Sequence, residues 1–460
     1  MAEPGMAESN NSLEEQIGQW RSYLRRRQAI QPVDVAELED HLRGEVATLS
    51  HAGLSENEAF LVAVKRMGAL DTISSEFARE HSERLWKQLV IGSLDSDRLV
   101  TQSRREALVV FALAMAAAVA FKLPELFGQD WGSDASDPFY LRNFSLFVLP
   151  FLTGYFLWKR RLGPRHWGGL ALAFAASAVA VNVYPFQRGA DTLALSALHL
   201  PIALWLPVGI AYAGGRWRDS AGRMDFVRFS GELLIYFALM ALGGGVVTGL
   251  TAGMFQAIGI DFEPVFEELI PSAILGAVIV ASWLVEAKQS VIENMAPVLT
   301  RLFTPLFTLV LLVFLGTMIW TGRGISIERN ALIAFDLVLV LVLGLLLYSI
   351  SARDSQAPPG AFDLLLVLLL VSALIADAFA LAAIGARISD FGFTPNRVAA
   401  LGENVILLGN LGWSTVLYLR FLSGRGSFTS LESWQTAYLP VYSIWAAIVV
   451  MGFPPLFGFE

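Results

Sequence analysis

The sequence predicts an all-α protein that crosses a membrane many times and carries a small helical domain at its N-terminus. From residue 105 onward, apolar stretches of roughly 20 residues recur, the length that a helix needs to cross the hydrocarbon core of a bilayer. Hydrophobic residues make up 55% of the chain, charged residues only 16%, and mean hydropathy is +0.55. Soluble proteins carry about 25% charged residues. The expected domains are therefore a helical prefix, residues 1–95, and a multi-pass transmembrane domain, residues 105–460.

The composition also limits the chemistry of the chain. It contains no cysteine, which excludes disulfides, thiolate metal sites and cysteine nucleophiles. Residues 1–15 have neither a basic segment nor an apolar core, so a cleaved signal peptide is not expected. The prefix domain is therefore expected in the cytoplasm, with Arg98, Arg104 and Arg105 as a basic flank before the first span.

Four helices are expected in the prefix domain, each with a start signal and apolar residues at helical spacing. The first helix is expected to start at Ser12 with Glu15, and the second to start at Pro32 and end at Gly53. The third is expected to start at Ser55 with Glu58 and end at Gly68, and the fourth to start at Asp71. Paired Ser and Glu residues three apart form a capping box, and glycine easily adopts the left-handed conformation that ends a helix.

The segment Ala36 to Glu80 contains the strings GLSENEAF and AVKRMG, and in their order and spacing it resembles the permease prefix domain, also known in a similar version as the HAAS signalling domain. That resemblance implies a cytoplasmic module ahead of a membrane domain, linked in many relatives to PadR-like regulators, with a protein-contact role and no catalysis. A cytoplasmic protein partner is accordingly expected to bind residues 12–90. Acids outnumber bases in this segment, so direct nucleic-acid binding is not expected.

Eleven transmembrane helices are expected in the second domain. They are residues 106–123, 142–158, 167–186, 193–214, 228–254, 266–285, 302–320, 330–350, 361–385, 396–419 and 435–455. Basic residues gather in the loops 159–165 and 216–228, whereas the loops 125–138 and 256–264 contain no Lys or Arg. This asymmetry follows the positive-inside rule, although the later loops follow it less closely. It predicts a cytoplasmic N-terminus and, because the number of spans is odd, a C-terminus on the opposite side of the membrane.

A second resemblance covers residues 140–425 and is sharpest in the last third. The stretch that begins NMAPVLTRLF at residue 294 and the segment GFTPNRV, Gly392 to Val398, are similar to a bacterial membrane family known as domain of unknown function 4153. The resemblance implies a protein of the bacterial inner membrane, with a periplasmic C-terminus in the orientation above, and no established activity. Within GFTPNRV, Thr394 is expected to cap a helix that begins at Pro395.

The fifth expected span contains Gly245, Gly249 and Gly253, a repeated small-xxx-small pattern. Such glycines allow a neighbouring helix to approach closely, so we expect them to pack against another helix inside the bundle. The alternative is an unwound, ion-coordinating segment, as in transporters with discontinuous helices.

Three acidic residues, Asp336, Asp377 and Glu403, lie within the eighth, ninth and tenth spans. A charge inside a membrane is costly unless it is paired or hydrated, so each needs an explanation. We expect all three roughly 9 to 12 Å from the far-side end of their helices, at about 1.5 Å per residue. They then form a candidate polar site for a cation, protons or a basic ligand group. Alternatively, each acid bonds to a nearby hydroxyl or carbonyl and holds the bundle together.

Further polar residues in the tenth span are assigned to the same candidate site. Asn396, Glu403 and Asn410 recur every seventh residue, which keeps them near one helix face. Arg397 points away from Glu403 on the same helix and could reach an acid on a neighbouring one.

Other ionisable residues are not assigned to a functional site. His199 is expected to be a buried core histidine. Glu232 is expected either to reach the membrane surface by snorkelling or to pair with a residue such as Arg228. Glu267 and Glu268 lack the arginine and the later histidines of an intramembrane metalloprotease, so that class is excluded.

The sequence contains no catalytic triad, phosphate loop or metal-binding spacing, so no enzyme activity, cofactor or metal is expected. Two functions remain. The first is a regulatory or sensory membrane protein whose prefix domain contacts a partner. The second is an ion- or proton-coupled secondary transporter that uses the acidic residues. The sequence leaves the ligand, the partner and the oligomeric state open.

Overall fold

The computed structural model describes residues 13, 16–18, 32–68, 94–134, 137–260, 263–287, 295–322 and 329–460. In these ranges every regular element is a helix. The chain divides into two compact units, Met1–Glu106 and Ala107–Glu460. This agrees with the predicted all-α, multi-pass fold class.

The first unit contains a pair of helices, α2 (Pro32–His51) and α3 (Glu56–Gly68), and the beginning of α5. Ile17, Leu42 and Phe60 are at most 2% exposed and belong to the small core between the helices. Gly53 has a φ of 101°, which allows the tight turn after α2. The expected first helix lies largely, and the fourth entirely, outside the described residues.

The capping box expected before α3 is present. The Ser55 hydroxyl and backbone N–H both donate to the Glu58 carboxylate, at 2.7 Å and 3.0 Å, and the Glu58 N–H donates to the Ser55 hydroxyl at 3.4 Å. These bonds hold the pKa of the fully exposed Glu58 carboxyl below its usual value.

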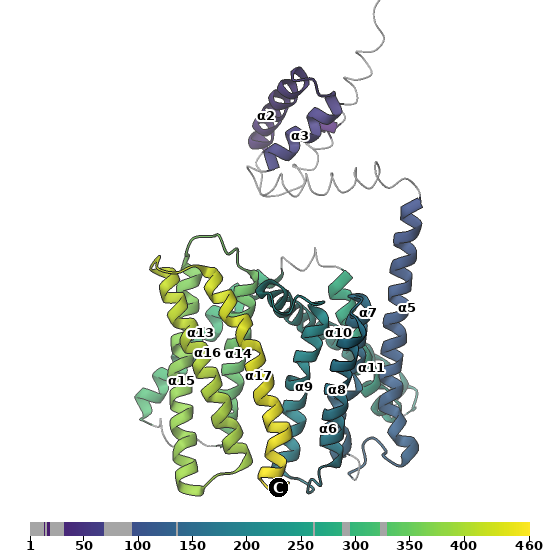
Figure 1. The fold of residues 1–460 in the computed structure, drawn as a ribbon, viewed down its shortest axis with the longest axis vertical. Coiled ribbons are helices and arrows are strands. Elements are labelled where there is room, and N and C mark those ends of the chain that lie inside the picture. Colours follow the sequence, from purple (N-terminus) through teal and green to yellow (C-terminus); the bar gives the residue numbers. More distant parts are fainter. Residues whose placement is uncertain are drawn as a thin grey trace, which may run out of the picture. The chain divides into compact units, whose positions relative to one another are not determined.

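The second unit is a bundle of long helices that run alternately in opposite directions (Figure 1). Its elements are α5 (Leu94–Lys122), η1 (Leu123–Phe127), α6 (Asp137–Asn143), η2 (Phe144–Phe147), α7 (Leu149–Lys159), α8 (Pro164–Val183), α9 (Asp191–Tyr212), α10 (Ser220–Ala257), α11 (Glu263–Ala287), α13 (Met295–Thr321), α14 (Arg329–Ala352), α15 (Ala361–Phe391), α16 (Pro395–Leu422) and α17 (Phe428–Leu456). Within the described residues, ten helices are long and apolar enough to cross a membrane.

The span expected at residues 142–158 is not a single helix, and that prediction is wrong. The chain there is divided into α6, η2 and α7, and α7 at about 1.5 Å per residue is too short to cross a bilayer alone. Pro150 explains the break, since it lacks an N–H and its ring excludes the carbonyl of a preceding helical turn.

The broken segment nevertheless runs along the depth of the bundle. At its start, the side chain of Asn143 exchanges hydrogen bonds of 2.7 and 2.9 Å with Asn182 near the end of α8. At its other end, Arg160 donates to the carbonyl of Tyr212 at the end of α9. Because α8 and α9 are antiparallel, these contacts lie at opposite faces of the unit. The segment therefore provides an eleventh crossing beside the ten long helices.

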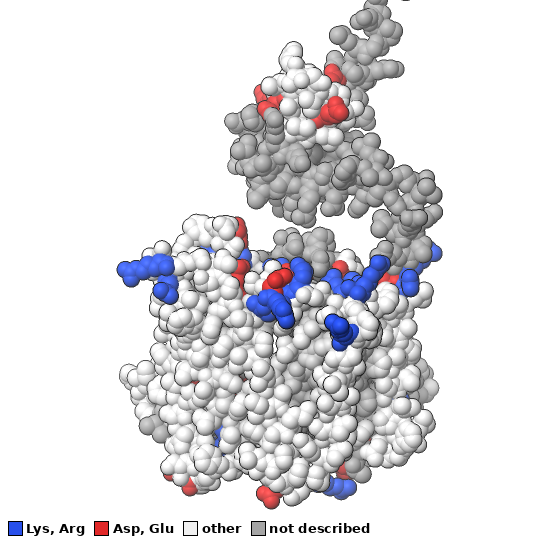
Figure 2. All heavy atoms as spheres, viewed as in Figure 1, with Lys and Arg blue, Asp and Glu red and all other residues white. Residues whose placement is uncertain are grey.

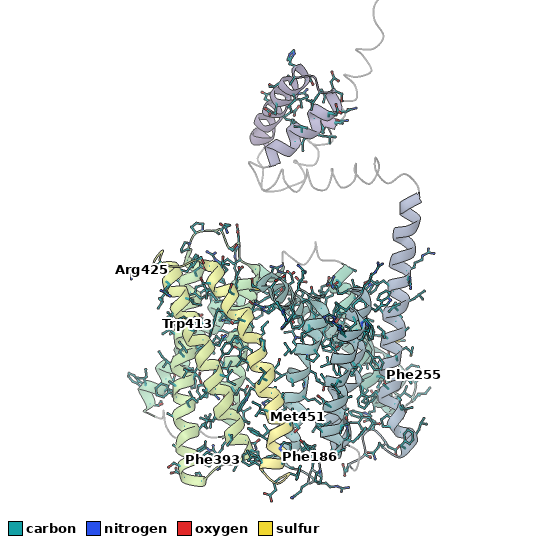
Figure 3. The ribbon with its side chains drawn as sticks, viewed as in Figure 1. Phe186, Phe255, Phe393, Trp413, Arg425 and Met451 are labelled. Atoms are coloured by element: carbon teal, nitrogen blue, oxygen red, sulfur yellow. The ribbon has the colours of Figure 1, made fainter. Side chains whose placement is uncertain are left out.

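The two ends of the helices form two faces of the second unit. We call the face with loops 160–163, 213–219, 353–360 and 423–427 the basic face, and the opposite face, with loops 184–190 and 392–394, the far face. Figure 3 shows Arg425 at the basic face, and Phe186 and Phe393 at the far face. Lys and Arg side chains gather along the basic face in Figure 2.

The core of the second unit has two parts. One is formed mainly by α5 to α11 and the other by α13 to α17. The parts meet where α17 packs along α9, and the Tyr184 hydroxyl, just after α8, donates to the carbonyl of Met451 on α17. The helices that carry the candidate acidic residues, α14, α15 and α16, belong to the second part.

The side chain of Arg353 fastens the second part at the basic face. It follows α14 and makes two hydrogen bonds with Asp363 on α15, Nε to Oδ1 at 3.0 Å and Nη2 to Oδ2 at 3.1 Å. Its guanidinium also lies 4.7 Å and 4.4 Å from the ring centroids of Phe421 and Phe428. One side chain therefore joins the ends of four helices.

The glycine pattern of α10 does not pack inside the bundle. The helix is continuous from Ser220 to Ala257, and a Cβ added at Gly245, Gly249 or Gly253 would meet nothing within 4 Å. Both expectations for these glycines, helix packing within the bundle and an unwound segment, are therefore wrong. Lipid is as apolar as a neighbouring helix, so the pattern alone does not distinguish a lipid-facing surface from a protein contact.

Candidate functional site

Asp336, Asp377 and Glu403 lie on three helices of the second core, α14, α15 and α16 respectively. Asp377 is completely buried, whereas Asp336 and Glu403 are half-buried. Asp336 is close enough to both of the other carboxyls to interact with them electrostatically. The structure therefore brings together the three acids that the sequence selected.

The depth of the three acids differs from the expectation. Measured along their helices at about 1.5 Å per residue, Asp336 and Glu403 are about 10 and 12 Å from the far-face end. Asp377 is about 21 Å from the end of α15, so the expected depth is wrong for this residue. The reason is that α15 continues to Phe391, beyond its expected end at residue 385.

Asp377 has an unusual environment for a carboxyl group. Both of its oxygens are buried and have no hydrogen-bond partner. Neighbouring positions on α15 are small and apolar, since Ala373, Ala376 and Ala380 are all fully buried. A buried polar group without a partner is rare in folded proteins, and such groups often mark a functional site.

Asn404 is the residue that sequence analysis missed. Its side-chain Nδ2 donates to Asp336 Oδ1 and to the carbonyl of Ala400, each at 2.8 Å. Its Oδ1 is buried and has no partner. Asn404 lies three residues before Leu407 and seven before Leu411, both buried, and this spacing in the sequence could have placed it on the inward face of α16.

The other predicted members of the site lie elsewhere. Arg397 donates to the carbonyls of Phe391 and Gly392, at 3.1 and 2.8 Å, and so caps the end of α15. Asn410 exchanges hydrogen bonds with Gln435 on α17, at 3.2 and 3.1 Å. Asn396 is half-buried near the start of α16. Residues at heptad spacing share a helix face, but here they contact different neighbours along that face.

Thr394 caps α16 as expected, because its hydroxyl accepts a hydrogen bond from the Arg397 N–H at 3.4 Å. His199 is 8% exposed, and its Nδ1 is 2.8 Å from the carbonyl of Leu195, as expected for a core histidine. Glu268 pairs with Lys122 at 3.2 Å at the far face. Glu232 is 4% exposed on α10, one turn after Arg228.

The site is rich in hydrogen-bond acceptors, since the oxygens of Asp377 and Oδ1 of Asn404 have no donor. Among the described residues, no Lys or Arg forms an ion pair with Asp336, Asp377 or Glu403. In the same residues no group of three or more His, Cys, Asp or Glu side chains could hold a metal ion. Comparisons with protein-family models, curated proteins and solved structures found no match for this chain. The chemistry of the site is therefore inferred from its own geometry.

Proposed function

We propose that this chain is a regulatory membrane protein of the bacterial inner membrane. In this proposal the carboxyl site at Asp336, Asp377 and Glu403 receives the signal, and the N-terminal helical unit passes it to a cytoplasmic protein. The observation that carries the proposal is Asp377, a fully buried carboxyl with two unpartnered oxygens. An acid kept in such a position without a partner is poorly suited to a structural role, because it weakens the fold unless something binds it.

The distribution of charge supports the proposed orientation. Lys and Arg side chains gather on the basic face (Figure 2), at the loops that contain Arg160, Arg216 and Arg425. Cytoplasmic loops of membrane proteins carry an excess of these residues, so the basic face is assigned to the cytoplasm. The C-terminus lies on the far face (Figure 1), which this orientation assigns to the periplasm.

The chemistry of the N-terminal unit supports a protein partner. Acidic side chains predominate on the described part of this unit, at Glu39, Asp40, Glu45, Glu56 and Glu58. Such a surface repels nucleic acid and anionic lipid headgroups. The resemblance of residues 36–80 to a signalling module favours the same role.

The test uses the full chain in lipid nanodiscs, with cytosolic proteins captured at acid and at alkaline pH. We expect recovery of one cytosolic protein to differ about fivefold or more between the two pH values, the lower end of allosteric coupling. Asp377→Asn should remove the difference. Asp390→Asn, an exposed acid on the same helix, should retain it. If no cytosolic protein is recovered in amounts that differ between the two pH values, the proposed regulation is contradicted.

A proton-coupled transporter is the second candidate, and the joining of three acids on adjacent helices favours it. Proteoliposomes with an imposed pH gradient distinguish the two functions. A transporter accelerates the decay of the gradient in the wild type and not in Asp377→Asn. With a regulatory protein, the gradient decays at the same rate in proteoliposomes as in liposomes without protein.

A further inference from the structure

The hydrogen-bonding groups around Asp377 are unbalanced. An ionised carboxylate offers only acceptors, and an asparagine side chain offers two N–H donors. Asn404 already uses both donors, for Asp336 Oδ1 and the carbonyl of Ala400. Three buried oxygens remain without a donor: Oδ1 and Oδ2 of Asp377, and Oδ1 of Asn404. The site therefore lacks donors rather than acceptors.

The size and composition of the site limit what can supply a donor. A hard metal ion takes six or more oxygen ligands, and the described residues contain no cluster of three acidic or histidine side chains that could hold a metal. Buried alanines flank Asp377 on its own helix, at positions 373, 376 and 380. A proton needs no additional space, and it converts one acceptor oxygen into a donor.

The charged groups near Asp377 favour a proton on this carboxyl. Asp336 on α14 interacts electrostatically with Asp377 and with Glu403. The other ionisable side chains described on the helices packed against α15 are Arg301, Tyr348, Arg397, Tyr418 and Arg420. Arg397 is held at the far face by two carbonyls, and the remaining four lie toward the basic face. Asp336 is therefore the described acid on a neighbouring helix whose charge acts on Asp377.

We infer that the ligand of this site is the proton and that Asp377, buried and without a hydrogen-bond partner, holds it, while Asn404 positions the nearby Asp336 carboxylate. This inference rests on the proposed function, in which the same site receives the signal. In the binding step a hydronium ion transfers its proton to a lone pair of an Asp377 oxygen and leaves a water molecule. One O–H bond breaks and one forms, and the net charge of the site rises by one. Asp336 is the more exposed of the two and provides the entry.

Asn404 acts here as a positioning residue. By donating to Asp336 Oδ1 it stabilises the ionised form of Asp336, so that the proton is held on the more deeply buried Asp377. Replacing Asn404 by leucine, of similar volume, removes this donor. The proton should then be distributed differently between the two carboxyls.

Infrared difference spectroscopy of the full chain in nanodiscs tests the inference, because a protonated carboxyl has a C=O band distinct from that of a carboxylate. Comparing spectra at acid and alkaline pH, we expect one protonated-carboxyl band that Asp377→Asn removes and Asp390→Asn leaves unchanged. Asn404→Leu should shift the frequency of this band or the pH at which it disappears. A spectrum of Asp377→Asn identical to that of the wild type would overturn the inference.

A second measurement keeps the test valid if Asp377→Asn fails to fold. Wild-type protein labelled with ¹³C in the aspartate carboxyls should show the isotope shift of the band, whereas glutamate labelling should not; no shift on aspartate labelling would overturn the inference. Adding sodium at fixed pH separates a proton from a competing metal ion, and loss of the band on sodium addition would contradict the proton as the ligand. The band reports the proton whether or not a partner exists. An intact band without pH-dependent partner capture would therefore count against the proposed function alone.

Discussion

Contacts in the two parts of the membrane unit illustrate two ways of holding helices together. In the first part the rings of Tyr212 and Phe229 are stacked with centroids 4.5 Å apart, and Phe156 meets both edge-on. In the second part a buried polar group, Asn410 with Gln435, joins α16 to α17. Helices in lipid gain little from the hydrophobic effect, so specific pairing depends on close packing or on hydrogen bonds. This protein uses both, and the two contacts give one example from each part.

Two buried acidic residues, one from each part, differ in whether they are paired. Glu286 in the first part is 3% exposed at its side chain and pairs with Lys159 at 3.2 Å and Arg160 at 3.0 Å. Asp377 in the second part is equally buried and has no partner. A paired acid fixes the ends of helices, whereas an unpaired one is available to a ligand. The predictions below test whether this distinction holds.

The largest effect is expected from Gly402→Ala in the second part. A Cβ at Gly402 would overlap the indole ring of Trp445 on α17, so the two helices must move apart. Overpacking of this kind costs about 1–3 kcal/mol. Thermal unfolding in detergent should show a clear loss of stability, and Trp445→Ala should restore part of it. Gly249→Ala, where a Cβ meets nothing, is the matched control and should leave the unfolding temperature unchanged or raise it.

A smaller loss is expected from Glu286→Gln. The change leaves Lys159 and Arg160 without their carboxylate, and both retain some exposure to water. We therefore expect destabilisation of about 1–2 kcal/mol, less than for a fully buried pair. The loss should diminish at high salt, and the same thermal assay measures it. A stability equal to that of the wild type would show that the pair does not fasten α7 to α11.

Asp377→Asn should have almost no effect on stability, in contrast to Glu286→Gln. Asparagine has nearly the same shape, and its amide supplies the donor that the site lacks. We expect a change within about 0.5 kcal/mol in the thermal assay. A large loss would mean that Asp377 is a structural acid with a partner, and would remove the difference between the two parts of the unit.

The smallest effect concerns Glu58 in the N-terminal unit, an exposed acid partnered only by hydrogen bonds. Because these bonds lower the pKa of Glu58 in the folded state, they stabilise the fold above the usual pKa of glutamate. That contribution is lost as the pH falls through the lowered value. Carbon-13 NMR titration of glutamate carboxyls should give Glu58 a midpoint below the usual range. Ser55→Ala should raise the midpoint toward it, and an unchanged midpoint would contradict the capping box.

Much of the fold followed from sequence patterns, because hydrophobic length and capping residues act locally. Thr394 and Ser55 cap their helices as predicted. The interruption before Pro150 was overlooked, since a run of apolar residues concealed a proline that was visible in the sequence. The outward orientation of Gly249 was not predictable, because lipid and protein surfaces are equally apolar.

The candidate site was predicted in part. The three acids stood out because charges are rare within apolar spans, and the structure brings them together. The role of Asn404 at Asp336 and the contacts of Arg397 at the end of α15 were not predicted. Both depend on which side chains meet across neighbouring helices. Periodicity places residues on a face of one helix, but it does not state which neighbour that face meets.

The side chain of Arg353 has a mechanical consequence. It anchors α14 and α15 to the rings of Phe421 and Phe428 at the basic face, while Asp336 lies near the opposite end of α14. Toward its other end α14 is held to α16 by the hydrogen bond from Asn404 to Asp336, so loss of that bond would let α14 pivot about the Arg353 contacts. A change of charge at Asp336 should therefore spread the helices most widely at the far face, with their ends at the basic face serving as the fulcrum.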